Sequence, residues 1–409
     1  MTEEKKSMVP KLRFPEFTET WEQRKFEDLF TEYAEKGFNQ YPALSIVQGA
    51  GTIERDKSNR NLSYSTKNLG NYKIVYKDDF ILHLRSFEGG LERACSTGLV
   101  SPAYHVFHSD GVNSSFFYCI FRSSNFINRL LKPCVYGIRD GKSINISELK
   151  NIYLNVPGIS EQKKIGDFFD SIDSLITLHQ RKLDVLNKLK KYLLQKMFPE
   201  NGQLIPELRF PAFSGAWEQR KLSEIVRMNA RIGWQNLRQS EFLDDGDFLL
   251  ITGTDFKNGR VNFGTCHYIA KERFDQDPKI QVEEGSILLT KDGTIGKVAL
   301  VDKLSKPATL NAGVYNIVPK NRVVESRFLF QYLSAPFLLD YVNKAATGGT
   351  IKHLNQSILV DFPVSFPSVA EQEKIGKFLE GIDHVTTLHQ RKLEGLRKLK
   401  KSLLQQMFV

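Results

Sequence analysis

Residues 160–198 read SEQKKIGDFFDSIDSLITLHQRKLDVLNKLKKYLLQKMF, and residues 370–408 read AEQEKIGKFLEGIDHVTTLHQRKLEGLRKLKKSLLQQMF. The two segments align without a gap, and the heptapeptide TLHQRKL is identical at residues 177–183 and 387–393. In both segments the apolar residues alternate four and three positions apart. That spacing, sustained over about five heptads, is typical of a coiled coil. The sequence therefore predicts two long helices with matching apolar stripes.

We expect the two helices to bury these stripes against each other. An isolated amphipathic helix of about 38 residues, or about 57 Å, would leave its stripe in water. An antiparallel pair, with one domain at each end, is favoured over a parallel pair. His179 and His389 fall in the stripe and are expected to set its register rather than to bind a metal. Lys190 interrupts the stripe, and Leu189 is expected to replace it. The residues predicted to pair the helices are Ile165, Phe169, Ile172, Ile176, His179, Leu183, Leu186, Leu193, Ile375, Leu379, Ile382, His389, Leu393, Leu396 and Leu403.

A second repeated block lies upstream of each helix. Residues 10–30 read PKLRFPEFTETWEQRKFEDLF, and residues 206–226 read PELRFPAFSGAWEQRKLSEIV. The chain thus consists of a shared leading block, a divergent part and a shared helix, and this order occurs twice. Two copies are too few for a solenoid, so we expect a pseudo-dimer within one chain, related by an approximate two-fold axis.

These repeats define the predicted domain boundaries. They are a first variable domain at 1–158 (leading block 10–30, variable part 31–150), a first long helix at 159–198, a linker at 199–205, a second variable domain at 206–368 (leading block 206–226, variable part 227–360) and a second long helix at 369–409.

The two variable parts are predicted to contain both strands and helices. Short apolar runs bounded by turn residues predict strands at 72–76, 80–84, 248–251 and 286–289. One-sided apolar patterns predict helices at 115–131 and 326–342, and Gly- and Asn-rich segments predict loops at 48–61 and 252–264. The predicted fold class is α+β: two mixed α/β domains separated by two long helices in an antiparallel coiled coil, with internal pseudo-two-fold symmetry.

The composition of the 409 residues is that of a soluble globular protein, with 41% hydrophobic and 25% charged residues. No apolar run reaches the roughly 18 residues of a membrane span, and the opening MTEEKKSMVPKLRF lacks the apolar core of a secretory signal. The four cysteines are scattered and form no CxxC pair, which favours a reducing compartment. We therefore expect a cytoplasmic protein with no membrane partner.

The net charge of +10 favours a polyanionic partner such as nucleic acid.

Motifs of known catalytic sites are missing from the sequence. Residues 136–143, YGIRDGKS, resemble a phosphate loop, but only three residues separate Gly137 from Gly141 where that motif requires four. No dinucleotide-binding fingerprint, no amino-methyltransferase loop, and no zinc-protease, hydrolase or nuclease motif occurs. We therefore expect this chain alone to catalyse nothing, to bind no cofactor and to hold no metal.

The variable parts are the natural place for recognition, because they differ between otherwise matched halves. Arg reads guanine and Asn or Gln reads adenine in the major groove, whereas Lys more often contacts phosphates. For any single residue, an ordinary solvated side chain is the competing interpretation. The candidate DNA contacts are Lys57, Asn59, Arg60, Asn61, Tyr64, Arg85 and Arg93 in the first part, and Arg231, Trp234, Gln235, Lys257, Arg260, Lys291 and Lys297 in the second.

Both halves also place glycine next to a cation just before the long helix. Small residues allow backbone N–H groups to approach a phosphate, and a cation then completes the contact. The candidates in these two segments are Arg139 and Lys142 in the first half, and Gly349, Thr350 and Lys352 in the second.

Two variable domains that alternate with two nearly identical long helices resemble the specificity subunit of type I restriction-modification systems. The resemblance covers essentially the whole chain. Four paired blocks carry it: the LRFPxFxxxWEQRK pattern from Leu12 and from Leu208, the helix starts VPGISEQKKIG and FPSVAEQEKIG, the TLHQRKL heptapeptide, and the KLKKxLLQxMF helix ends. Each block alone is a weak signal, whereas four pairs in the same order are a specific one.

The resemblance implies a non-catalytic subunit of a larger enzyme. Each variable domain would be a target-recognition domain that reads one half of a bipartite, asymmetric sequence in double-stranded DNA. The helices would set the spacing between the half-sites and dock two modification (methyltransferase) subunits, which bind S-adenosylmethionine and methylate adenine. Two restriction (translocase and nuclease) subunits, which use ATP and Mg²⁺, would join through the modification subunits.

Two other classes of function stay open at this point. One is a stand-alone nucleic-acid-modifying enzyme whose site the motif search does not find. The other is a coiled-coil adaptor that binds only proteins. Binding of the isolated chain to DNA, and its activity without other subunits, distinguish the three classes.

Overall fold

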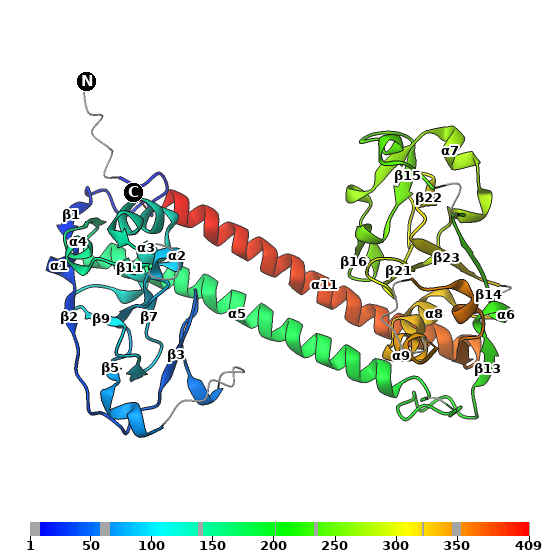
Figure 1. Ribbon diagram of the computed structural model, residues 1–409, viewed down its shortest axis with the longest axis horizontal. Coiled ribbons are helices and arrows are strands. Elements are labelled where there is room, and N and C mark those ends of the chain that lie inside the picture. Colours follow the sequence, from blue (N-terminus) through cyan, green and yellow to red (C-terminus); the bar gives the residue numbers. More distant parts are fainter. Residues whose placement is uncertain are drawn as a thin grey trace. The chain divides into compact units, whose positions relative to one another are not determined.

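The computed structural model describes residues 9–57, 66–137, 142–200, 202–232, 236–320, 323–345 and 353–408. Its contacts divide the chain into two compact units. Unit 1 comprises residues 1–179 and 392–409, and unit 2 comprises residues 180–391. Each unit therefore holds one variable domain together with the start of one long helix and the end of the other (Figure 1). The predicted boundaries instead treated each helix as a segment of its own.

The variable domain of unit 1 is built on a four-stranded antiparallel sheet in the order β2-β9-β6-β7. Its strands are β2 (Thr31–Tyr33), β9 (His105–His108), β6 (Phe80–Leu82) and β7 (Glu92–Arg93). Further strand pairs are β3 (Leu44–Val47) with β4 (Gly51–Glu54), β5 (Lys73–Val75) with β8 (Gly98–Val100), and β10 (Val135–Tyr136) with β11 (Ser143–Ile144). The helices are α1 (Phe26–Leu29), α2 (Ser86–Gly89), α3 (Ser114–Arg122), a π-helical turn (Phe126–Leu131) and α4 (Ile146–Lys150).

The variable domain of unit 2 is built on a six-stranded sheet in the order β14-β23-β20-β21-β17-β16 and a four-stranded sheet in the order β18-β15-β22-β19. The first comprises β14 (Val226–Ala230), β23 (Val314–Pro319), β20 (Ile287–Thr290), β21 (Val298–Leu300), β17 (Arg260–Val261) and β16 (Phe256–Lys257). The second comprises β18 (His267–Ile269), β15 (Phe248–Ile251), β22 (Ala308–Leu310) and β19 (Gln281–Val282). The helices are α6 (Leu222–Ile225), α7 (Lys271–Asp275), α8 (Ser326–Leu333), α9 (Pro336–Ala345) and α10 (Gln356–Val360).

The central strand of each domain is buried on both faces, which explains its uninterrupted apolar sequence. In β6, Phe80 packs into one hydrophobic cluster and the adjacent Ile81 into another. In β20, Ile287 and Leu288 divide between two clusters in the same way. Because successive side chains of a strand point to opposite faces, each domain builds two small cores around this strand.

Each variable domain begins and ends in one antiparallel strand pair. In unit 1, β1 (Glu22–Lys25) pairs with β12 (Tyr153–Val156), and Glu22 lies opposite Val156. In unit 2, β13 (Glu218–Lys221) pairs with β24 (Pro363–Phe366), and Glu218 lies opposite Phe366. The repeated EQRK sequence of the leading block thus forms the first strand of each domain, and it pairs with the last strand, which directly precedes the long helix.

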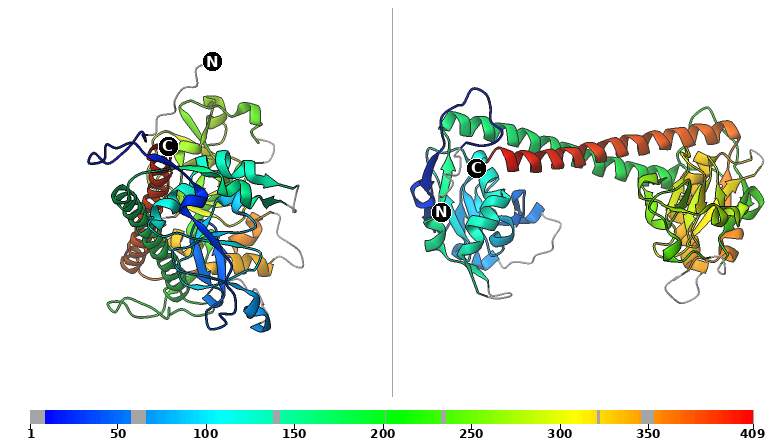
Figure 2. Two further views of the ribbon diagram at one scale, coloured as in Figure 1. Left: turned by 90° about the vertical axis from the view of Figure 1, so that its left-hand side faces the viewer. Right: turned by 90° about the horizontal axis from the view of Figure 1, so that it is seen from above.

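The long helices are α5 (Ile159–Lys196) and α11 (Val369–Gln406), each of 38 residues. In unit 1 the start of α5 lies beside the end of α11, where the ring centroids of Phe169 and Phe408 are 5.9 Å apart. In unit 2 the start of α11 lies beside the end of α5, where Lys190 forms an ion pair with Asp383. Within each unit the two helix segments run antiparallel, as the sequence predicted, and the right-hand view of Figure 2 shows the red end of α11 at unit 1.

The residues predicted to pair the helices are all buried or half-buried. Those of the first turns do more than pair helices. Ile165 and Phe169 belong to a core cluster that contains Phe116 of α3, and Ile375 and Leu379 belong to the corresponding cluster of unit 2. The start of each helix is therefore part of the core of the variable domain that precedes it.

Four local predictions were wrong. The helix predicted at 326–342 is α8 followed by α9, with Ser334 and Ala335 between them. The helix predicted at 115–131 is α3 followed by a separate π-helical turn, because Ser123 leaves the helical conformation. The loop predicted at 48–61 contains β4. The loop predicted at 252–264 contains the β16–β17 hairpin, whose turn residues Asn258 and Gly259 have φ values of 53° and 73°. Asn-Gly between two strands is the usual sequence signal for such a turn, and the loop prediction overlooked it at residues 258–259.

Candidate nucleic-acid interface

A bidentate ion pair joins the leading block of each unit to the start of a long helix. In unit 1, Nε and Nη2 of Arg13 each donate a hydrogen bond of 2.7 Å to the Glu161 carboxylate, whose side chain is 3% exposed. In unit 2, Arg209 makes the same two bonds to Glu371, at 2.7 and 2.8 Å. These hydrogen bonds raise the pKa of both guanidinium groups. They explain why LRFP and the Glu-Gln pair at the helix start are repeated together.

The glutamine that follows joins the helix to the variable domain. Gln162 donates to the carbonyl oxygen of Pro157 and accepts from the backbone N–H of Asn113, the N-cap residue of α3. Gln372 makes the corresponding bonds, to Pro367 and from the N–H of Glu325, the N-cap residue of α8. One buried amide thus fixes the position of a variable-domain helix relative to the long helix in each unit.

The helix ends carry aromatic anchors. In unit 2, the ring of Phe198 lies 5.5 Å from Phe328 and 6.3 Å from Trp217. In unit 1, the ring of Phe408 lies 5.6 Å from Phe116 and 6.2 Å from Trp21. The repeated Met-Phe ends of the helices therefore complete the cores of the variable domains.

Lys190 lies in the seam between the helices and Leu189 lies in solvent, whereas the sequence predicted the reverse. Lys190 forms an ion pair with Asp383 and its side chain is 21% exposed, whereas Leu189 is 42% exposed. The seam accepts a cation here because Asp383 of the antiparallel helix supplies the counter-charge. Lys400 and Asp173 repeat the pair in unit 1, at 2.6 Å.

Many of the predicted DNA contacts lie outside the described residues. They are Asn59, Arg60, Asn61, Tyr64, Arg139, Trp234, Gln235, Gly349, Thr350 and Lys352, together with the side chain of Lys57.

Four of the other candidates project into solvent. Arg85, Lys142, Lys257 and Lys297 are exposed, and none of them forms an ion pair with a described residue. Lys257 lies on the β16–β17 hairpin, and Lys142 has its Nζ atom 5.5 Å from the centroid of the Phe87 ring. Lys291 is half-buried, with Nζ 5.5 Å from the Tyr315 centroid. These cations stay candidates for contact with phosphate.

Arg231 was predicted to contact DNA, and the structure places it inside unit 2. The residue is 2% exposed. Its Nε donates to the carbonyl oxygen of Leu310 at 2.9 Å. Burial lowers the pKa of its guanidinium group. Its side chain has no path to a base edge in this arrangement, so we withdraw it as a candidate contact.

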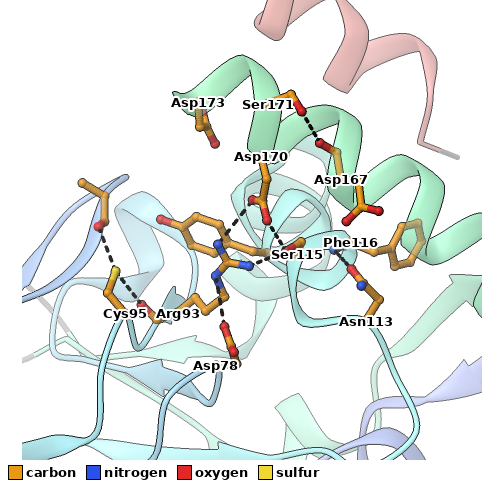
Figure 3. Close-up of polar contacts among 12 residues, drawn as sticks. Asp78, Arg93, Cys95, Asn113, Ser115, Phe116, Asp167, Asp170, Ser171 and Asp173 are labelled. Atoms are coloured by element: carbon orange, nitrogen blue, oxygen red, sulfur yellow. Dashed lines mark hydrogen bonds and ion pairs between the residues drawn. The ribbon is translucent and has the colours of Figure 1, made fainter. Parts of the chain in front are cut away.

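Arg93 and Arg260 are also committed to contacts within the protein, contrary to the prediction. Figure 3 shows the Arg93 guanidinium directed at Asp78, Ser115 and Asp170 of α5. Arg260 lies between Asp302 and Glu380 of α11, at 2.5 and 2.8 Å. A guanidinium that already faces two carboxylates and an aromatic ring has few donors left for DNA.

One residue that carries much of the unit 1 geometry was missed. Glu92 is fully buried and accepts from the backbone N–H groups of Gly49 and Gly51, at 2.8 and 3.1 Å. Tyr118 and Arg122 donate to the same carboxylate. Burial raises the pKa of Glu92. Glu92 thereby holds the β3–β4 turn, and in the sequence it is one of two adjacent charged residues between Leu91 and Ala94, which does not mark it as buried.

Among the described residues, no group of three or more His, Cys, Asp and Glu side chains is arranged to hold a metal ion. In the same part of the chain, every helix is too short or too polar to cross a membrane.

Comparison with known structures places this fold among proteins of one kind. The S subunit of a type I restriction-modification system from M. genitalium superposes with a TM-score of 0.65 at 16% identity, over 98% of this chain and 99% of that one. A chain from a structural study of assembly and conformational transition of the type I R-M system gives a TM-score of 0.51 at 14% identity, over 94% and 96%.

The sequence comparisons define the family. The profile of the type I restriction modification DNA specificity domain matches residues 18–188 and again residues 215–398. The chain belongs to this family, which confirms the resemblance seen in the sequence.

Curated relatives include the MjaVIII and putative MjaX type I restriction enzyme specificity subunits of Methanocaldococcus jannaschii. This chain is 23% identical to the first over 263 residues, which cover 62% of this chain and 61% of that protein. It is 24% identical to the second over 288 residues, which cover 69% and 64%. The matches thus span somewhat less than two thirds of each relative.

Proposed function

We propose that this protein is the DNA-specificity subunit of a type I restriction-modification complex and has no catalytic activity of its own. Each variable domain reads one half of a bipartite, asymmetric target in double-stranded DNA. The helices set the spacing between the half-sites and dock the other subunits. S-adenosylmethionine, ATP and Mg²⁺ belong to those partner subunits, and the complex works in the cytoplasm, where its DNA is.

One observation carries this proposal: a constant framework holds two different readers. The Arg13–Glu161 and Arg209–Glu371 pairs are the same in both units, and so are the closing strand pairs. The domains between them differ, since the largest sheet has six strands in unit 2 and four strands in unit 1. Two different variable domains, each attached to the long helices by the same contacts, suit the recognition of two different half-sites. The exposed cations in both domains and the net charge of +10 suit a polyanion.

The helices also carry a matching set of exposed apolar residues in each unit. Unit 1 exposes Leu175, Leu178 and Leu399, and unit 2 exposes their counterparts Val385, Leu388 and Leu189, all between 41 and 49%. Large apolar residues in a group on the surface mark protein contacts. Two equivalent faces suit two copies of one partner, so we assign them to two modification subunits. Two restriction subunits then join through the modification subunits.

Reconstitution with the modification subunits tests the proposal. With S-adenosylmethionine and genomic DNA, the complex is expected to methylate adenines at one bipartite sequence, read strand by strand by single-molecule sequencing. The chain alone is expected to bind DNA with an affinity that falls steeply with salt and to methylate nothing. Methylation by the chain alone would show an enzyme, and no DNA binding with or without partners would show a protein-only adaptor.

The docking faces have their own test. Leu178→Glu together with Leu388→Glu is expected to abolish binding of both modification subunits, while each single change leaves one subunit bound. Mass photometry of the mixtures counts the subunits. Arg181→Glu together with Arg391→Glu, at exposed positions of the same heptapeptides, serves as the matched control. Full assembly of the Leu variants would exclude these faces as docking sites.

A further inference from the structure

Asp170 of α5 and Glu380 of α11 occupy equivalent positions of the two repeats, and each receives an arginine from its variable domain. Nη2 of Arg93 lies 3.3 Å from Oδ1 of Asp170 in unit 1. Nη2 of Arg260 lies 2.8 Å from Oε1 of Glu380 in unit 2. The variable domains thus keep one contact to the helix although their sequences have diverged.

The surroundings of the two arginines also match. Cζ of Arg93 lies 5.4 Å from the ring centroid of Tyr118 in α3, and Cζ of Arg260 lies 5.3 Å from that of Phe330 in α8. Stacking on an aromatic face and pairing with a carboxylate together fix the plane of a guanidinium group. Each arginine is therefore held in one orientation between a short domain helix and a long helix.

The second oxygen of each helix carboxylate is occupied as well. Ser115 donates to Oδ2 of Asp170 at 2.5 Å, and Nε of Arg327 lies 2.9 Å from Oε2 of Glu380. Ser115 and Arg327 both stand two residues after the N-cap of their helix, α3 or α8. The same junction is thus built twice, from a helix carboxylate, a domain arginine and the first turn of a domain helix.

The arginines come from strands that do not correspond. Arg93 lies on β7, directly opposite Phe80 of the central strand β6. The counterpart in unit 2 is Leu300 of β21, opposite Ile287 of the central strand β20. Arg260 lies one strand further out, on β17, opposite Leu300. In each unit an arginine thus reaches the equivalent carboxylate of a long helix, but from a different strand. This indicates that the ion pair is required in its own right and does not merely follow from the path of the chain.

Each arginine adjoins a surface loop. Glu92, next to Arg93, holds the β3–β4 turn through Gly49 and Gly51. Arg260 follows the Asn258–Gly259 turn, and Asn258 donates to Gln390 of α11. A shift of either arginine relative to the helix would therefore shift the loop beside it.

We propose that Arg93 and Arg260 are positioning residues, which fix the orientation of each recognition domain on its helix and do not touch the DNA. The inference rests on the proposed DNA-reading function. It changes the role of two arginines that the sequence had marked as contacts. The ion pairs hold each reader at the angle from which it meets its half-site.

Asp170→Asn in the complex with modification subunits separates positioning from DNA contact. If Arg93 positions the domain, Asp170→Asn and Arg93→Gln each weaken specific DNA binding about tenfold, the scale of one charge-assisted hydrogen bond. The double variant is expected to bind no more weakly than either single one, because both remove the same contact. If Arg93 instead contacted phosphate, removing the Asp170 charge would leave binding unchanged or strengthen it, and that result would overturn the proposal.

The salt dependence of binding gives a second readout. Arg93→Gln is expected to keep the slope of log K against log salt, whereas loss of a phosphate contact lowers it by about 1. Arg85→Gln, at an exposed cation of the same domain, is the control for a lowered slope. The methylated sequence is expected to be the same in every variant. Arg93→Lys, which keeps the charge, is expected to show a smaller loss at the same slope, and it covers the case in which Arg93→Gln fails to fold.

Different experimental results would refute the proposed function and the positioning role. If the unaltered complex shows no sequence-specific methylation, the proposed function is wrong. If the unaltered complex methylates one sequence and Asp170→Asn binds DNA as tightly, the DNA-reading function holds and only the positioning role is refuted.

Discussion

The Nζ atom of Lys400 lies 2.6 Å from Oδ1 of Asp173, and the equivalent Lys190 forms an ion pair with Asp383 in the other unit. The two pairs differ in burial. Asp173 is 39% exposed, whereas Asp383 is 19% exposed and also accepts from the buried amide of Gln331. Burial lowers the pKa of Lys190. Removal of the aspartate is therefore expected to lower the free energy of unfolding by different amounts in the two units.

Asp383→Asn is expected to lower the free energy of unfolding by about 2–4 kcal/mol, because it leaves the Lys190 ammonium group largely buried without a counter-charge. Asp173→Asn is expected to cost at most about 1 kcal/mol, because Asp173 is about twice as exposed as Asp383 and water can reach the site of the ion pair. Urea unfolding followed by circular dichroism measures both. Equal losses would show that burial does not control the strength of these pairs.

Two helix glycines allow the domain helices to approach the long helices. A Cβ atom on Gly166 would lie 2.3 Å from Oδ1 of Asn113, and one on Gly376 would lie 3.0 Å from the backbone N of Phe328. Gly166→Ala is expected to destabilise unit 1 by about 1–3 kcal/mol, since the overlap outweighs the gain in helix propensity of about 1 kcal/mol. Gly376→Ala is expected to cost less.

Gly381 and Gly395 are matched controls on α11, because an added Cβ at either would meet no atom within 4 Å. Gly381→Ala and Gly395→Ala are expected to stabilise the protein by about 0.5–1 kcal/mol through helix propensity alone. Thermal unfolding of the four variants gives the comparison. Stabilisation by Gly166→Ala would contradict the close packing described here.

His83 predicts a loss of stability in mild acid. Burial, followed by the charges of Arg122 and Arg85, lowers the pKa of His83 to about 4. The unfolded chain has a His pKa of about 6.5, so it binds the proton more tightly than the folded chain does. The contribution of His83 is therefore complete above about pH 6.5 and is lost as the pH falls towards 4, by at most about 3 kcal/mol.

Urea unfolding of the parent and of His83→Gln between pH 4 and 8 measures this effect. The difference in unfolding free energy between the two proteins is expected to shift in favour of the variant as the pH falls. A constant difference across that range would mean that His83 does not titrate with the lowered pKa.

The start of each leading block bonds the end of a long helix. The N–H of Leu208 donates to Lys196 at 2.8 Å, across the linker 199–205, and the N–H of Leu12 donates to Gln406 at 3.0 Å without a covalent link between the two. A protein that joins the end of α11 to Pro10 through the sequence PENGQLI, and opens instead within 199–205, is expected to fold. Its unfolding midpoint and methylated sequence are expected to match those of the parent, and a protein that does not fold would refute the equivalence.

The repeats predicted the framework well because the same physical constraints act on both copies. The 3.5-residue spacing predicted the helices to within three residues of the ends of α5 and α11. The approximate two-fold symmetry of the repeats also predicted the antiparallel contact within each unit. Lys190 was misjudged because its counter-charge, Asp383, lies 193 positions away, where no local pattern reveals it.

The candidate interface was harder to predict, because an arginine that pairs within the protein and one that binds DNA look alike in a sequence. Arg93 meets Asp170 across 77 positions, and Arg260 meets Glu380 across 120. Arg231 follows strand β14 and turns into the domain. Exposed cations such as Lys257 and Lys297 fit the prediction, and their contact with DNA stays a prediction.

The strand pairs β1–β12 and β13–β24 have a consequence for how such a protein changes its target. Each variable domain enters and leaves through neighbouring strands, so its whole fold forms a cassette between two adjacent junctions. The EQRK and Glu-Gln sequences at these junctions are the same in both repeats. Recombination between genes at those two short identities would exchange one variable domain and leave its contacts to the long helices intact, and under the proposed function it would give the cell a new methylation pattern in a single event.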